Sequence, residues 1–260
     1  MPIHTPPIFQ QKTAIITGAG IGIGFEIARQ LAAQGAHIVL NDVQEQATEA
    51  AVERIRQEGG SIRGVTGNSG HLDCIQQMID TAVSTFGTLD MIVANAGITT
   101  FGRFLDYPVE HFQQLVQVNL QGTFFLAQQA AQQMIRQQSG GRLVFMSSVT
   151  GHTYHPDLTA YGMSKAAIVF LAKSLGVELA RHQITVNAIS PGATLTERTL
   201  DLEGGEYQEQ WNRTTPNGRC ATTQDIAHAA LFLLHPLSSH ITGQTLVVDG
   251  GWTAMSPPPK

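Results

Sequence analysis

The sequence is poor in the residues that would indicate a disulfide scaffold, a metal centre or a membrane protein. Its 260 residues include two cysteines, Cys74 and Cys220, which form neither a disulfide framework nor a metal-binding spacing. The ten histidines are scattered, so we expect no metal site. The apolar runs fall far short of the roughly 20 residues that a membrane-spanning helix needs. The N-terminal stretch lacks the apolar segment of a secretory signal. These absences predict a protein of the reducing cytoplasm.

Charged residues are also scarce. They make up 13% of the chain, and the net charge of −5 leaves no basic patch, so we expect no nucleic-acid partner. A hydrophobic fraction of 42% suits one large core, and we find no internal repeat or linker. We therefore expect a single dinucleotide-binding and catalytic domain over residues 1–260. It would have an N-terminal arm at 1–11, a substrate loop with short helices at 193–219, and a C-terminal tail at 252–260.

Short buried strands alternate with amphipathic helices along the chain. The strands are expected at residues 12–17, 36–42, 62–66, 89–94, 143–146, 184–189 and 244–248. The helices are expected at residues 25–35, 44–58, 72–86, 108–138, 158–181 and 225–234. This order predicts an α/β fold, a single Rossmann-type doubly wound domain with a seven-stranded parallel sheet flanked by helices on both faces. In such sheets ligands bind beyond the carboxyl ends of the strands.

A glycine-rich turn joins the first strand to the first helix. It has the spacing T-G-x-x-x-G-x-G from Thr17 to Gly24, not G-x-G-x-x-G. Glycines let a backbone approach a pyrophosphate, and the following helix N-terminus supplies N–H groups. Tight packing of strand on helix is the alternative. We assign this turn to the cofactor through Gly18, Gly20, Ile21, Gly22 and Ile23.

Two more strand ends carry candidate cofactor residues. Asp42 ends the second strand, where a carboxylate can accept from the adenosine ribose hydroxyls and would repel a 2′-phosphate. The glycine turn contains no Arg or Lys, and none directly follows Asp42, so the sequence favours NAD over NADP. Val43, next to Asp42, is also a candidate cofactor-binding residue. A helix cap at 44–58 is the alternative for Asp42. Asn95, Ala96 and Gly97 follow the fourth strand and would leave room for a ribose, although a simple turn is possible there.

Tyr161 and Lys165 are the candidate catalytic pair. If residues 158–181 form one helix, the two side chains project from one face, one turn apart. The cation would then lower the phenol pKa from its usual value of about 10 toward neutrality, which suits a general acid/base. Ser148 ends the preceding strand and could bind the substrate oxygen. A solvated helix face is the alternative for the pair.

Asn119 lies in the middle of the long helical pattern at 108–138. Asparagine is a poor residue for a helix interior unless its side chain has a partner. A local break or π-bulge would turn its polar groups inward. A buried structural asparagine is the alternative.

These pieces together resemble the short-chain dehydrogenase/reductase family. The resemblance extends from Thr17 to Gly251 and includes TGAGIGIG, ANAG at 94–97, YGMSK at 161–165, SPGATLT at 190–196 and ITGQTLVVDGG at 241–251. It implies a nicotinamide dinucleotide cofactor and a homotetramer built on the long helices and the C-terminal strand. It also implies a set of catalytic residues and a set that flanks the nicotinamide. The catalytic residues are Asn119, Ser148, Tyr161 and Lys165; the flanking residues are Pro191, Gly192, Thr194 and Thr196.

One position departs from the family pattern. Relatives usually have Asp-Val after the third strand, where the Asp contacts adenine, and this chain has Asn68 and Ser69. An amide oxygen can still accept from the adenine amino group. For the substrate we name Ser148 and Tyr161, with His155 and Trp211 in the pocket wall.

The function expected from the sequence is hydride transfer between NAD and a small-molecule secondary alcohol or ketone. The substrate could be a sugar, a polyol or a 3-hydroxyacyl compound. Alternatives are an NADPH-using reductase of the 3-oxoacyl type, an epimerase or dehydratase, and a non-catalytic nucleotide-binding regulatory protein. The regulatory protein would not need Tyr161 and Lys165.

Overall fold

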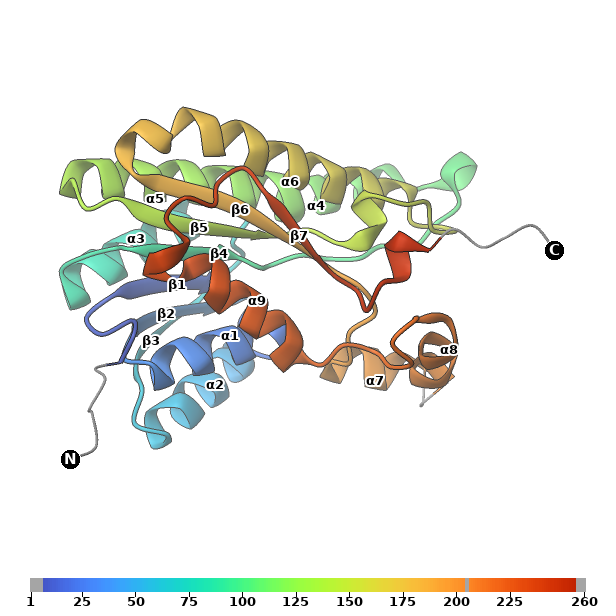
Figure 1. Ribbon diagram of the computed structural model, residues 1–260, viewed down its shortest axis with the longest axis horizontal. Coiled ribbons are helices and arrows are strands. Elements are labelled where there is room, and N and C mark those ends of the chain that lie inside the picture. Colours follow the sequence, from blue (N-terminus) through green and yellow to red (C-terminus); the bar gives the residue numbers. More distant parts are fainter. Residues whose placement is uncertain (1–6, 204–205, 256–260) are drawn as a thin grey trace.

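The computed structural model describes residues 7–203 and 206–255. Its centre is one seven-stranded sheet in which all neighbouring strands are parallel, in the order β3-β2-β1-β4-β5-β6-β7 (Figure 1). The strands are β1 (Thr13–Thr17), β2 (His37–Asp42), β3 (Ser61–Thr66), β4 (Met91–Ala94), β5 (Gly141–Met146), β6 (Ile184–Pro191) and β7 (Thr245–Val248). This confirms the predicted fold class.

Helices cover both faces of the sheet (Figure 1). They are α1 (Gly22–Ala33), α2 (Glu45–Gln57), α3 (Leu72–Phe86), α4 (Val109–Leu115), α5 (Thr123–Gln137), α6 (Thr159–Glu178), α7 (Glu197–Glu203), α8 (Glu206–Thr214) and α9 (Thr223–Leu234). The alternation of β-strand side chains divides the core into two layers. Ile16 packs in the layer of α1, α2 and α9, whereas its neighbour Ile15 packs in the layer of α3, α5 and α6. The central strands are therefore apolar on both faces.

The strand order reverses direction between β1 and β4. From β1 the chain moves outward through β2 to β3, and from β4 it moves the other way to β7. Sheets of this kind bind ligands beyond the carboxyl ends of the strands, at the point where the strand order reverses.

The long helical pattern at 108–138 is interrupted in the structure. A π-helical segment, Val116–Gly122, separates α4 from α5, with Asn119 at its centre. The predicted break at this asparagine is therefore confirmed.

The described parts of the predicted arm and tail are structured, and the substrate loop contains the expected short helices. Phe9 is buried, and its N–H donates to the carbonyl of Gln34, so the described part of the predicted arm packs on the C-terminal end of α1. Trp252–Ala254 form a single 3-10 turn. The rest of the arm (1–6) and of the tail (256–260) lies outside the described residues. Within 193–219, α7 and α8 are the expected short helices. Among the described residues no helix has the length and apolarity to cross a bilayer, and no cluster of three potential metal ligands occurs.

Candidate active site

A cleft of about 570 Å³ follows the carboxyl edge of the sheet, bounded by the loops after β1 to β6. Most of the residues predicted from the sequence line it. They are Gly18, Ile21, Gly22, Ile23, Asp42, Val43, Asn68, Ser69, Asn95, Ala96, Gly97, Ser148, Tyr161, Lys165, Pro191, Gly192, Thr194 and Thr196. Gly20, Asn119, His155 and Trp211 are not among its lining residues.

The glycine turn after β1 is packed against the loop after β4. A Cβ on Gly18 would lie 2.7 Å from the Cα of Ala96, and one on Gly24 would lie 2.5 Å from the Asn95 amide nitrogen. That nitrogen donates to the carbonyls of Thr17 (3.0 Å) and Gly18 (2.8 Å). The side chain of Asn95 thus fastens the two loops together. Close packing, the alternative weighed for this turn, explains Gly18 and Gly24.

Gly22 has a different environment from these two glycines. Its φ of +65° favours glycine, and a Cβ there would meet nothing closer than 3.5 Å, at Thr196. The backbone at Gly22 is therefore open to a ligand in the cleft.

The carboxylate of Asp42 is held at one end of the cleft by two backbone donors. Oδ2 accepts from the N–H of Gly20 at 3.0 Å and Oδ1 from the N–H of Gln44 at 3.1 Å. Gly20 therefore acts by fixing Asp42 and not by lining the cleft. The second bond closes a local turn before α2; Gln44 and not Asp42 is the N-cap residue of that helix, so the alternative of a helix cap does not hold for Asp42.

Asn68 lies near the same end of the cleft. Its Oδ1 accepts from the N–H of Gly70 at 2.8 Å. One lone pair of that oxygen is left for a ligand such as an adenine amino group.

Tyr161, Lys165 and Ser148 meet at the other end of the cleft. The Tyr161 hydroxyl is hydrogen-bonded to the side chains of Ser148 and Thr99. The Lys165 ammonium lies 5.6 Å from the centre of the Tyr161 ring and donates to the carbonyl of Met146 at 2.8 Å. Lys165 is 4% exposed. The geometry predicted for the pair is therefore present, and Thr99 is an additional partner of the phenol.

The electrostatics of the pair differ from the expectation. Burial raises the pKa of Tyr161, and this effect outweighs the lowering by the hydrogen bonds from Thr99 and Ser148 and by the charge of Arg198. Burial also lowers the pKa of Lys165 to about 8. The expectation that Lys165 brings the phenol pKa toward neutrality is wrong for this structure. The ammonium lies over the ring and bonds Met146, so the removal of water from the hydroxyl dominates.

Asn119 joins the loop after β4 to α6 from beneath the cleft. It is 1% exposed; its side chain accepts from the N–H of Ile98 (2.9 Å) and donates to the carbonyl of Ile98 (3.0 Å) and the hydroxyl of Ser164 (3.1 Å). Ser164 in turn donates to the carbonyl of Tyr161 at 2.7 Å. Asn119 is therefore a buried, satisfied residue that positions the backbone next to Tyr161. Ser164 was not among the residues predicted from the sequence, where its signal is its place directly before Lys165.

His155 and Trp211 are not in the cleft wall, which corrects the prediction for these two residues. Their rings stack on each other with centroids 6.4 Å apart, and Trp252 contacts Trp211 edge-on at 5.4 Å. Tyr207, which lines the cleft, lies 6.2 Å from Trp211. The large rings of three distant segments bury one another, so Trp211 holds α8 in place behind Tyr207.

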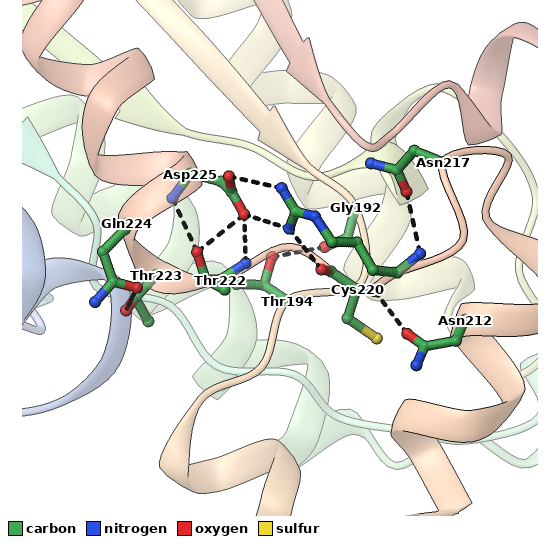
Figure 2. Close-up of polar contacts among 10 residues, drawn as sticks. Gly192, Thr194, Asn212, Asn217, Cys220, Thr222, Thr223, Gln224 and Asp225 are labelled. Carbon is green, nitrogen blue, oxygen red and sulfur yellow. Dashed lines mark hydrogen bonds and ion pairs between the residues drawn. The ribbon is translucent and has the colours of Figure 1, made fainter.

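The base of the α7–α8 segment is fastened on its C-terminal side. Arg219 makes an ion pair with Asp225 at 2.7 Å, and Asp225 and Thr222 form a capping box at the start of α9. Figure 2 shows these contacts around Asp225, together with the bond from the N–H of Cys220 to Asn212 in α8 (2.8 Å). On the other side, the Thr194 hydroxyl donates to the carbonyl of Gly192 at 3.0 Å. Both ends of the segment are thus held by local contacts.

The fold and the cleft define a Rossmann-type α/β protein with a ligand site where the strand order reverses. Comparison with known proteins narrows this class. The profile of a family described as enoyl-(acyl carrier protein) reductase matches residues 18–253. The chain is 36% identical to an L-rhamnose 1-dehydrogenase (NAD(P)(+)) of a Sphingomonas species, over 94% of this chain and 97% of the relative. It is 37% identical to the 3-oxoacyl-[acyl-carrier-protein] reductase FabG of Staphylococcus aureus, over 92% and 97%.

Solved structures with a similar fold include further dehydrogenases. A short-chain type dehydrogenase/reductase from Mycobacterium marinum superposes with a TM-score of 0.90 at 34% identity, covering 96% of this chain and 98% of that one. A 7α-hydroxysteroid dehydrogenase complexed with NADH and 7-oxo glycochenodeoxycholic acid gives 0.89 at 34% identity, covering 95% and 96%. The chain belongs to the short-chain dehydrogenase/reductase family, and the resemblance noted in the sequence is confirmed. It is an oxidoreductase acting on alcohol or ketone groups.

Proposed function

We propose that the protein is an NAD-dependent oxidoreductase that interconverts a small secondary alcohol and its ketone. The observation that supports this most directly is the meeting of Tyr161, Ser148 and Lys165 at one end of a cleft whose other end contains Asp42. The cleft thus has a proton-transfer group at one end and a ribose-binding carboxylate at the other.

The residues present fit a nicotinamide dinucleotide. Backbone at Gly22 is open toward the cleft, and the Asp42 carboxylate is held at its edge. The buried ammonium of Lys165 makes one recorded hydrogen bond within the described residues, to Met146, although it has three N–H donors. The unused donors suit the hydroxyls of the nicotinamide ribose. When bound, the cofactor supplies the hydride donor or acceptor.

Tyr161 would exchange the proton with the substrate oxygen. Because burial raises its pKa, the phenol is protonated near neutral pH and is ready to donate to a ketone oxygen. In the reverse direction the deprotonated phenol takes the proton from the alcohol, and the hydrogen bonds from Thr99 and Ser148 and the charge of Arg198 partly offset the effect of burial on this phenolate form. Ser148 also orients the substrate oxygen, and Asn119 holds the adjoining backbone.

The preference for NAD over NADP is proposed from the charges along the cleft. Of the lining residues, Asp42, Lys165 and Arg198 carry charge, and both cations lie at the Tyr161 end. A 2′-phosphate next to Asp42 would therefore meet a carboxylate and no compensating cation.

We propose further that the protein is a cytoplasmic homotetramer. Both cysteines are free and buried, as suits a reducing compartment. The outer faces of α5 and α6 expose large apolar side chains, with Phe170 at 69% and Val177 at 76% exposure. Apolar patches of this kind mark contacts between copies.

An NADH-production screen over sugars, polyols and 3-hydroxyacyl esters tests the activity. With an accepted substrate, Tyr161→Phe should lower kcat by at least about 100-fold, the usual contribution of a positioned acid/base, and leave NADH affinity near the wild-type value. Full turnover by this variant would exclude the acid/base assignment.

Asp42→Ala tests the cofactor preference. It should shift the ratio of kcat/KM for NAD to that for NADP toward NADP by about tenfold, because one close charge repulsion of about 1.4 kcal/mol is removed. An unchanged ratio would count against the ribose contact.

A further inference from the structure

Arg198 is a cation of the cleft whose hydrogen-bond donors the proposed reaction does not use. It lines the cleft from α7, and its Nη2 donates to the carbonyl of Thr99 over a long 3.4 Å. The side chain of Thr99 is also a hydrogen-bond partner of the Tyr161 hydroxyl. The guanidinium of Arg198 and the hydroxyl of Tyr161 therefore share Thr99 as a hydrogen-bond partner.

The charge of Arg198 is not neutralised by any described carboxylate. The ion pairs recorded among the described residues involve other arginines and Lys12. The neighbouring carboxylate, Glu197, is directed elsewhere: its Oε2 lies 3.7 Å from the Cβ position of Gly22 in the glycine turn.

The two ends of the cleft consequently have opposite charge. Asp42 is the carboxylate of the adenosine end, and Lys165 and Arg198 are the cations of the Tyr161 end, where none of the described lining residues is acidic. Lys165 is buried and bonded to Met146, whereas Arg198 is exposed and mostly free to bond a ligand. A planar guanidinium presents paired N–H donors that match the two oxygens of a carboxylate or phosphate.

We propose that Arg198 binds an oxyanion of the substrate, so that the enzyme acts on hydroxy or oxo compounds that carry a carboxylate or a phosphate. The oxyanion lies at the guanidinium while the reacting carbon lies beside Tyr161 and Ser148. This inference rests on the proposed function and names its substrate class. It assigns specificity to the α7–α8 segment, from which Arg198 brings a charge to the cleft.

The first test compares ketones that differ mainly in charge. Acetoacetate is paired with acetoacetamide, and dihydroxyacetone phosphate with dihydroxyacetone, each with NADH. The variants are Arg198→Leu and Arg198→Lys, with Arg213→Leu as the control, because Arg213 is an exposed arginine of α8 paired with Glu209 and does not line the cleft.

The wild type should prefer the charged member of at least one pair by tenfold or more in kcat/KM. A hydrogen bond to a charged group contributes roughly 1.5–3 kcal/mol, which is about 10- to 150-fold. Arg198→Leu should abolish this preference through a higher KM, Arg198→Lys should restore part of it, and Arg213→Leu should match the wild type. The pair that responds distinguishes a carboxylate from a phosphate. A wild-type preference for the neutral members, or an equal loss on both members in Arg198→Leu, would overturn the proposal.

The second test does not depend on turnover. Isothermal titration measures the binding of malonate and of inorganic phosphate to each protein with and without NADH, and the binding of NADH itself. At least one anion should bind the wild type and lose about tenfold or more in affinity in Arg198→Leu, while NADH affinity stays unchanged. Absence of anion binding, or anion binding that survives in Arg198→Leu, would refute the proposal. A loss confined to NADH affinity would refute it as well, because Arg198 would then serve the cofactor. Failure of NADH to bind the wild type would instead count against the proposed function.

Discussion

Removing the buried charge of Lys165 should stabilise the fold while it removes activity. The pKa of Lys165 is about 8 in the folded protein and its ordinary value is 10.5, so the charged form costs about 3 kcal/mol at pH 7. Lys165→Met keeps the length of the side chain and removes that cost, but it leaves the carbonyl of Met146 without its donor, at about 1–3 kcal/mol. At pH 7 we expect the variant to be as stable as the wild type, or up to about 2 kcal/mol more stable.

The dependence of stability on pH separates the effect of the buried charge from other effects of the substitution. The folded pKa of Lys165 is below the unfolded value, so between about pH 8 and pH 10.5 the unfolded chain binds more protons and wild-type stability rises with pH. Burying the charge of Lys165 costs the wild type about 3 kcal/mol at pH 7 and about 1.4 kcal/mol near pH 9.5. Lys165→Met lacks this cost, so its gain in stability over the wild type should shrink by about 2 kcal/mol between the two pH values.

Urea unfolding of both proteins at the two pH values measures this change. Lys173→Met, on the exposed side of the same helix, is the matched control for loss of a lysine without loss of a buried charge. If the difference between Lys165→Met and wild type did not vary with pH, the desolvation argument for Lys165 would be refuted.

Two more substitutions test parts of the cleft. Gly24→Ala would place a methyl 2.5 Å from the Asn95 amide nitrogen and the Gly18 carbonyl oxygen. It should therefore lower the free energy of unfolding in urea by about 1–3 kcal/mol and weaken NADH binding measured by titration. Unchanged values would mean that the two loops separate without cost. Trp211→Ala removes ring contacts to His155, Tyr207 and Trp252 that contribute about 0.5–1.5 kcal/mol each. It should therefore raise the substrate KM several-fold with a smaller change in kcat, and limited proteolysis within 197–214 should become faster. An unchanged KM would show that α8 does not shape the substrate end of the cleft.

Local sequence patterns were sufficient for much of the architecture. The strand and helix bounds agree with the expected ones to within a few residues, because apolar periodicity and glycine boundaries depend on residues near in the chain. The break at Asn119 was also predictable, since an asparagine in a helix interior needs a side-chain partner. The partner itself, the backbone at Ile98, was not predictable, because it comes from another strand end.

The wrong predictions, for the pKa of Tyr161 and for the positions of His155 and Trp211, concern properties that depend on contacts between distant segments of the chain. The pKa of Tyr161 depends on how far the folded protein excludes water from its hydroxyl, a quantity that the spacing of Tyr161 and Lys165 does not contain. His155 and Trp211 lie 56 residues apart in the chain, and only folding revealed that they stack on each other and not on a substrate.

By itself, the sequence determined the order of strands and helices, the glycine turn, and the helical spacing of Tyr161 and Lys165, since each depends on backbone preferences over a few neighbouring residues. The tertiary structure alone decided that Asp42 and Arg198 lie toward opposite ends of one cleft. Packing brings together segments that are distant in the chain, and the charge pattern of the site comes from that packing.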